Sequence, residues 1–127
     1  MYNCSSQQHY NKRIGELGEN MALEYLKKNK YSILKRNFRV KGGEIDIIAS
    51  HGKRLCFFEV KTRTSKAFGN PEDAVSFDKM RKMTRAAQTY LCYSKKEYDE
   101  IQFDVLSINL EEAHPIFHIP NAFEVPF

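Results

Sequence analysis

Three charged residues stand on two segments that otherwise look like buried strands: Asp46, Glu59 and Lys61. Residues 44–50 read EIDIIAS and residues 55–63 read LCFFEVKTR, and both are rich in the Ile, Val and Phe that are typical of strands. The intervening HGKR is a turn signal, so we expect the two strands to form an antiparallel hairpin. Charges are rare at buried strand positions unless they are paired or bind a metal ion.

The register of this hairpin brings two carboxylates together. If the turn is centred between Gly52 and Lys53, Asp46 stands directly opposite Glu59, with Cβ atoms about 5 Å apart. Two facing carboxylates are unfavourable unless one is protonated or a cation lies between them. Oxygen ligands with no Cys or His nearby favour a hard cation such as Mg²⁺ or Mn²⁺. The alternative is a structural salt-bridge cluster, and spacing alone does not separate the two.

Strand alternation assigns the neighbouring side chains to faces. Lys61 shares the side of Glu59, where it is placed to offset charge, orient a water molecule or meet a phosphate. On the first strand, alternation predicts one apolar face and one face that carries the acids. The apolar face holds Ile45, Ile47 and Ala49, and the other holds Glu44, Asp46 and Ile48.

A helix is predicted over residues 12–29 from a single apolar stripe. Gly18 falls on that stripe, which suggests close approach to another element. Glu19 lies at its border, where a carboxylate can reach the sheet, although a solvated border carboxylate is an equal alternative. The stripe consists of Ile14, Leu17, Met21, Tyr25 and Leu26.

The other expected elements alternate along the chain with short breaks. A second helix is capped by Ser76 or Asp78, runs to about Tyr93 and carries its apolar face from Phe77 to Leu91. Polar residues 1–11 are expected to be flexible, and residues 1–127 to form one domain. Strands are predicted at 31–40, 101–109 and, as a short edge strand between two prolines, 116–119, with a loop over 64–75.

Composition excludes several classes of protein. The chain has 127 residues, 42% hydrophobic and 28% charged, with a net charge of +4, which permits a polyanionic partner without demanding one. No apolar window is long enough to cross a membrane, and the N-terminus lacks the apolar stretch of a secretory signal. Cys4, Cys56 and Cys92 are odd in number and unsuited to a zinc knuckle or disulfide framework. Cys56 and Cys92 are expected to be buried, and a reducing cytoplasm fits best.

The ordered motifs of the chain resemble a known family. Asp46 followed by Glu59-Val60-Lys61 is similar to the D-x(n)-E-x-K signature of the PD-(D/E)XK, restriction-endonuclease-like nuclease superfamily. More closely, the chain resembles the small bacterial YraN (UPF0102) family over about residues 12–110. Lys30 departs from the pattern, because relatives often have Gly there. The matching blocks are Gly15-x-x-Gly18-Glu19-x-x-Ala22, Arg36-Asn37, Gly43-Glu44-Ile45-Asp46 and Phe58-Glu59-Val60-Lys61-Thr62-Arg63, continued by Phe68-Gly69-x-Pro71, Lys79 and Phe103-Asp104-Val105.

The resemblance implies a fold and a site. The fold would be α/β, with an αβββαβ core in which helices flank a mixed central sheet, as in archaeal Holliday-junction resolvases. The catalytic residues would be Glu19, Asp46, Glu59 and Lys61. Asp46, Glu59 and the Val60 carbonyl would bind Mg²⁺ or Mn²⁺, while Lys61 would position or activate the attacking water.

The resemblance also implies a reaction and a partner. The reaction would be hydrolysis of phosphodiester bonds in DNA, branched or flapped DNA included, by an endonuclease or exonuclease. A non-catalytic nucleic-acid-binding or adaptor module that keeps the fold is the alternative, and a homodimer would suit a symmetric junction. Basic residues expected to meet backbone phosphates, unless they form an ordinary solvated face, are Lys41, Arg63, Lys66, Lys79, Arg81, Lys82 and Arg85.

Two further groups of residues have weaker interpretations. Three aromatic residues are candidate groups for stacking on bases, with an ordinary surface aromatic as the simpler interpretation: Tyr2, Tyr10 and Phe68. His114 and His118 would share a face of a strand, but no Cys or carboxylate partner that would complete a metal site is evident.

Overall fold

The computed structural model describes residues 4–64 and 75–127, apart from the side chains of residues 4–7. The predicted α/β fold with a helix, three strands, a helix and further strands is confirmed. In chain order the elements are α1 (Cys4–Lys28), β1 (Ser32–Val40), β2 (Gly43–His51), β3 (Arg54–Arg63), α2 (Phe77–Tyr93), β4 (Glu100–Asn109) and β5 (Ile116–Phe123).

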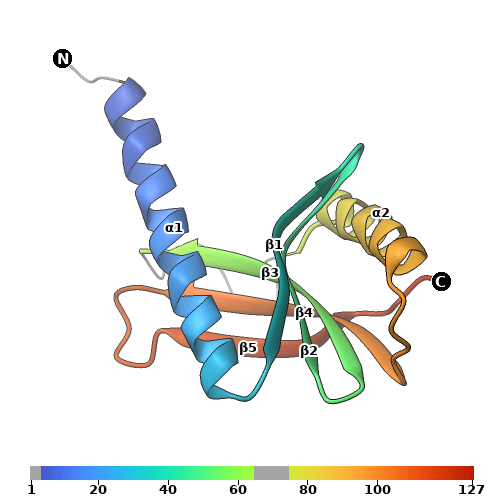
Figure 1. The fold of residues 1–127 in the computed structure, drawn as a ribbon. Helices are drawn as coiled ribbons and strands as arrows, with labels where there is room; N and C mark the ends of the chain where they lie inside the picture. Colours follow the sequence, from blue (N-terminus) through green and yellow to red (C-terminus); the bar gives the residue numbers. More distant parts are fainter. Residues whose placement is uncertain (1–3, 65–74) are drawn as a thin grey trace.

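The strands form one mixed sheet in the order β1-β2-β3-β4-β5 (Figure 1). Strands β3 and β4 are parallel, whereas every other neighbouring pair is antiparallel. A parallel pair needs a crossover connection, and here the connection contains α2. The strand that carries Glu59 and Lys61 is therefore the central strand, covered on both faces.

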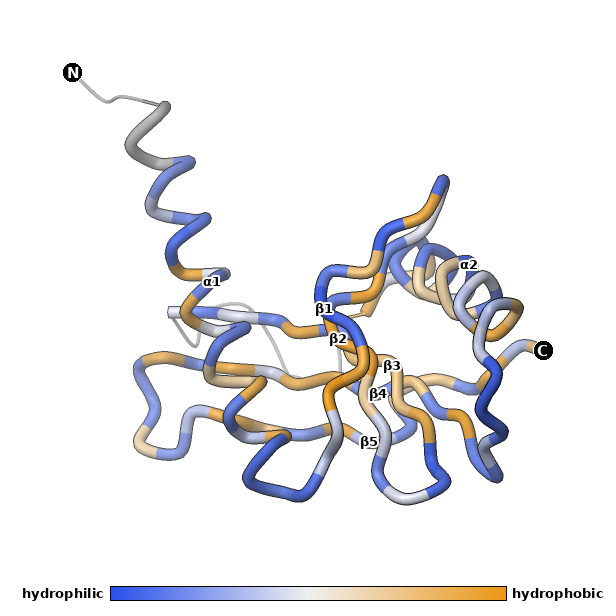
Figure 2. Tube along the Cα trace, viewed as in Figure 1, coloured by the Kyte–Doolittle hydropathy of each residue, from blue (hydrophilic) through white to orange (hydrophobic). Residues whose placement is uncertain are grey.

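The two helices pack on opposite faces of this sheet, each over its own apolar cluster. Ala22, Leu23 and Leu26 of α1 pack against one face, and Met83, Ala86 and Ala87 of α2 pack against the other. Figure 2 shows that the apolar residues are concentrated in the central strands between them. Burial of these side chains is the main force that holds the layers together.

Helix α1 begins at Cys4, earlier than the predicted residue 12. Residues 4–13 contain neither Gly nor Pro, so nothing in this stretch interrupts the helix. Residues 8–13 are all exposed, and this half of α1 extends beyond the sheet (Figure 1). The sequence pattern missed it because a segment that buries no apolar face has no apolar stripe. The flexibility expected for residues 1–11 stays a prediction.

The C-terminal end of α1 accounts for the unusual Lys30. The Tyr31 N–H donates to the Leu26 carbonyl at 2.9 Å, and the Lys30 N–H donates to the Lys27 carbonyl at 3.1 Å. This is the Schellman arrangement, in which the residue after the helix adopts the left-handed conformation that favours Gly. Lys30 has that conformation, with a φ of 71°.

Two glycines allow the helices to lie unusually close to the sheet. The expected close approach at Gly18 is confirmed, because a Cβ atom there would overlap the Thr62 side chain of β3. At Gly43, the first residue of β2, a Cβ atom would lie 2.6 Å from the backbone oxygen of Lys82 in α2. Each glycine thus positions one helix against a strand that carries a candidate site residue.

Three smaller predictions need correction. Strand β5 continues past Pro120 to Phe123, which an edge strand tolerates because its outer side needs no partner. Cys92 is exposed, and Phe77 is also exposed because it begins α2 beyond the packed part of the helix.

Neither helix in the described part of the chain is long and apolar enough to span a membrane.

Candidate functional site

The predicted register of the β2–β3 hairpin is confirmed. Its pairs run from His51 opposite Arg54 to Ile47 opposite Phe58, and Asp46 and Glu59 come directly after the last pair. There the Val60 N–H donates to Asp46 Oδ2 at 2.8 Å. A side chain therefore satisfies this backbone donor, and the Asp46 carboxylate is held at the point where the ladder ends.

The strands bend at this same point. Ile47 packs in the cluster beneath α1, but Ile45 packs in the cluster beneath α2, so the prediction that they share a face is wrong. Asn37 lies opposite Asp46, between the pairs formed by its neighbours in β1, and has a left-handed φ of 49°. Because Asn tolerates this conformation better than most residues, it provides the local bend in β1.

Glu59 is buried beside Asp46. The pKa of Glu59 is raised to about 8, mainly by burial. The charge of Asp46 and a hydrogen bond with Asp46 raise it further. Its Oε2 atom is buried and has no hydrogen-bond partner within the described residues. The predicted pair of carboxylates is thus present, and one of them is in an environment that disfavours its ionised form.

Lys79 of α2 reaches these acids across the sheet face. Its Nζ atom donates to Glu44 Oε1 at 2.8 Å and lies 3.3 Å from Glu59 Oε2, without the geometry of a hydrogen bond to Glu59. The hydrogen bond and charge of Lys79 lower the pKa of Glu44. We expected Lys79 either to meet a backbone phosphate or to belong to a solvated face. It is instead part of the acidic cluster, and its contact with DNA stays a prediction.

Glu19 reaches the sheet from α1, as one of the two alternatives predicted. Its Oε1 atom accepts a hydrogen bond of 3.1 Å from Asn37 Nδ2 and lies 3.7 Å from Arg36 Nη2. Sequence reasoning assigned no role to Asn37 or Glu44. The signal for Asn37 was an Asn within a strand, a residue type that is depleted there.

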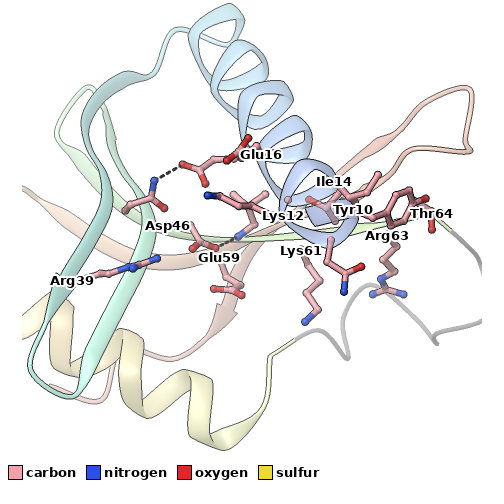
Figure 3. A pocket seen from close by; sticks show the side chains of 16 residues that line it. Tyr10, Lys12, Ile14, Glu16, Arg39, Asp46, Glu59, Lys61, Arg63 and Thr64 are labelled. Atoms are coloured by element: carbon pink, nitrogen blue, oxygen red, sulfur yellow. Dashed lines mark hydrogen bonds between the residues drawn. The ribbon is translucent and has the colours of Figure 1, made fainter. Parts of the chain in front are cut away.

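One cleft of about 940 Å³ lies between α1 and the strands β1, β2 and β3 (Figure 3). Glu19, Asp46, Glu59 and Lys61 all contribute to it, and Lys61 is exposed. The four candidate catalytic residues are therefore brought to one cavity from one helix and two strands: Glu19 from α1, Asp46 from β2, and Glu59 and Lys61 from β3.

The other candidate contacts to DNA are spread more widely. Arg63 lines the cleft, whereas Lys41, Arg81, Lys82 and Arg85 are exposed outside it. Arg81 and Lys82 both pair with Asp78 on the same helix. Lys66, Phe68 and the rest of residues 65–74 lie outside the described residues. All these contacts to DNA stay predictions.

The donor set suits a metal ion only in part. Within residues 4–64 and 75–127, no group of three or more His, Cys, Asp or Glu side chains is arranged to hold a metal. Asp46 and Glu59 supply two carboxylates, and Mg²⁺ is often bound by one or two carboxylates together with water and substrate phosphates. The chemistry of the pair therefore fits a cation that needs the substrate to complete its ligands.

A second polar cluster lies away from this cleft. Asp104 of β4 is fully buried and accepts hydrogen bonds from His118 Nε2 at 2.7 Å and from Gln102 Nε2 at 2.9 Å. The other ring nitrogen of His118 is 3.2 Å from the Tyr25 hydroxyl of α1. His118 thus has a carboxylate partner that sequence reasoning missed, because β4 and β5 become neighbours only in the sheet.

Comparisons with known proteins identify one family to which this chain is similar. The model of the uncharacterised protein family UPF0102 matches residues 18–108, which include all four candidate catalytic residues. A UPF0102 protein of Geobacter metallireducens is 47% identical over 119 residues, covering 93% of this chain and 98% of the relative. A UPF0102 protein of Dictyoglomus turgidum is 41% identical over 116 residues, covering 89% and 98%.

Proposed function

This chain belongs to the uncharacterised protein family UPF0102, and we propose that its cleft hydrolyses phosphodiester bonds in DNA with Mg²⁺ or Mn²⁺ held by Asp46 and Glu59. The observation that carries this proposal is the buried Glu59 Oε2 atom, which has no hydrogen-bond partner within the described residues and belongs to a carboxyl group that interacts with Asp46. A bound cation would satisfy that atom and would remove the electrostatic cost of two adjacent carboxylates.

The chain's own residues have distinct tasks in this proposal. The Val60 N–H fixes the orientation of the Asp46 carboxylate, and the Val60 carbonyl is the proposed third ligand. When bound, the cation supplies positive charge that stabilises the phosphoryl group under attack. Lys61 orients the attacking water and supports developing negative charge, since it is exposed in the same cleft. Glu19 acts from α1 on the metal or the water.

The non-catalytic alternative also has an observation in its favour. The ammonium group of Lys79 already lies between Glu44 and Glu59, so the acidic cluster has a built-in cation. If that ion pair is permanent, the cleft binds nucleic acid through its basic residues without cleaving it. Binding would then weaken steeply with salt, and no metal-dependent product would form.

The two alternatives are separated by a cleavage assay on linear, flapped and four-way-junction DNA with Mg²⁺ or Mn²⁺. We expect Asp46→Asn and Lys61→Ala each to lower the cleavage rate by about 100-fold or more. Lys53→Ala, an exposed lysine in the β2–β3 turn, is the matched control and should retain full activity. Equal cleavage by wild type and Asp46→Asn would indicate a contaminating nuclease and would refute the proposal. Salt-sensitive binding without cleavage would establish the alternative.

A further inference from the structure

The extended first half of α1 contributes to the cleft although it covers no part of the core. Tyr10 and Lys12 lie on this half, are exposed, and line the same cavity as Asp46 and Glu59. A helix that buries little apolar surface gains little stability from tertiary packing. Its position along the cleft is therefore better explained by what the cleft binds than by the needs of the core.

Tyr10 lies at the end of the cleft away from the two carboxylates. Figure 3 places it near Arg63, the last residue of β3, and near Thr64, which follows it. Four residues of an extended strand span about 13 Å. This distance between Glu59 and Arg63 equals the length of a few stacked nucleotides. The Tyr10 side chain is 53% exposed, which leaves its ring accessible to a ligand.

Basic side chains lie on both sides of the two carboxylates, because Arg39 is on the side away from Tyr10 (Figure 3). Arg63 is at the Tyr10 end, and Lys61 lies between that end and Glu59. Four basic residues line the cleft, Lys12, Arg39, Lys61 and Arg63, and four acidic ones, Glu16, Glu19, Asp46 and Glu59. The basic residues provide contacts for a phosphate backbone on either side of the acidic pair Asp46 and Glu59.

We propose that Tyr10 stacks on an unpaired base a few nucleotides from the scissile phosphate, so that the substrate of this cleft carries a single-stranded segment. This inference rests on the proposed function for the position of the scissile bond. A base within a duplex has both faces covered by its neighbours, whereas an unpaired base gains from stacking on an aromatic ring. Lys61 and Arg63 would follow the backbone of the same strand.

The test measures binding rather than cleavage. In an Asp46→Asn background, the affinities for a fluorescent oligothymidylate and for a blunt duplex are measured by anisotropy at fixed salt. Tyr10→Ala should weaken single-strand binding by about 5- to 150-fold, which corresponds to the loss of one base–aromatic stack of about 1–3 kcal/mol. Tyr10→Phe should retain it, and duplex binding should change less than about twofold. A fluorescent purine analogue in the strand should be quenched by the parent protein but not by Tyr10→Ala.

Tyr93→Ala removes another exposed tyrosine, far from the cleft on α2, and should leave both affinities unchanged. Equal weakening of single-strand and duplex binding by Tyr10→Ala, or no weakening of either, would overturn the inference. Its failure is distinguishable from failure of the proposed function, because metal-dependent cleavage lost in Asp46→Asn would still establish the nuclease. A Tyr10-dependent stack in a protein that cleaves nothing would instead support only a single-strand-binding module.

Discussion

Lys79 Nζ lies 2.8 Å from Glu44 Oε1 and 3.3 Å from Glu59 Oε2, so one ammonium group from α2 forms ion pairs with carboxylates on two neighbouring strands. The close approach of α2 to Gly43 makes this contact available. Lys79 is thereby in an ion pair with one of the proposed metal ligands, and its charge acts on both acids.

The first prediction concerns this contact. In the metal-free protein, Lys79→Met should raise the pKa of Glu59 above its value of about 8, because the charge of Lys79 lowers that pKa. Carboxyl carbon chemical shifts measured against pH report the change. Lys82→Met, three residues further along α2 and paired with Asp78, should leave the Glu59 titration unchanged. An unshifted titration in Lys79→Met would show that the ion pair does not form in solution.

The second prediction is a pH dependence of stability. The pKa of Glu59 rises from its ordinary value of 4.5 to about 8 in the folded protein, mainly through burial. Between these values the folded protein holds a proton that the unfolded chain releases, so this group makes stability fall as pH rises from about 4.5 to about 8. Urea unfolding at several pH values should show that the free energy of unfolding falls less with rising pH in Glu59→Gln than in wild type.

Metal addition provides the complementary measurement. Mn²⁺ or Mg²⁺ should stabilise wild type most at the upper end of this pH window, because the cation binds ionised carboxylates, and a chelator should reverse the effect. Glu59→Gln should lose most of this stabilisation. The same metal-induced stabilisation in wild type and Glu59→Gln would place the cation elsewhere.

The third prediction contrasts two glycines of α1. Gly18→Ala should lower the free energy of unfolding by about 1–3 kcal/mol, because the new methyl group overlaps Thr62 and pushes α1 away from β3. Gly15→Ala should raise it by about 0.5–1 kcal/mol, since nothing lies near that position and Ala is the better helix former. Chemical denaturation measures both. A similar effect of the two changes would contradict the packing seen here.

The fourth prediction concerns the polar cluster of Asp104, His118 and Gln102. His118→Ala should lower the free energy of unfolding by about 2–4 kcal/mol, because the fully buried Asp104 carboxylate would lose its hydrogen bond with the His118 ring. His114→Ala, at an exposed position, should change it by less than about 0.5 kcal/mol. Affinity for Mn²⁺ should be the same in both variants, since neither residue lines the cleft.

Local sequence signals predicted the hairpin that carries the site. A turn of known position sets the register of an antiparallel pair, and so the opposition of Asp46 and Glu59 followed from counting residues across HGKR. Gly18 was likewise predictable, because a helix has one stripe that faces the sheet and a glycine on it marks close approach. Both inferences required only the residues of one short segment of the chain.

Other features of the site depend on contacts between distant segments. Lys79 looked like one cation among several on α2, and only the packing of α2 against Gly43 brings it to Glu44 and Glu59. Strand alternation failed at Ile45 because β1 and β2 bend together at Asn37 and Asp46, which a period of two residues does not describe. His118 found its carboxylate partner, Asp104, on a neighbouring strand.

The sequence by itself determined the element types, the hairpin register and the identity of the acidic pair, because these depend on periodicity and on short loops whose geometry is local. The tertiary structure decided which cation accompanies that pair, how deeply Glu59 is buried, and that the first half of α1 lines the cleft with Tyr10. Burial and long-range electrostatics arise only when helices and strands pack, so no single segment encodes them.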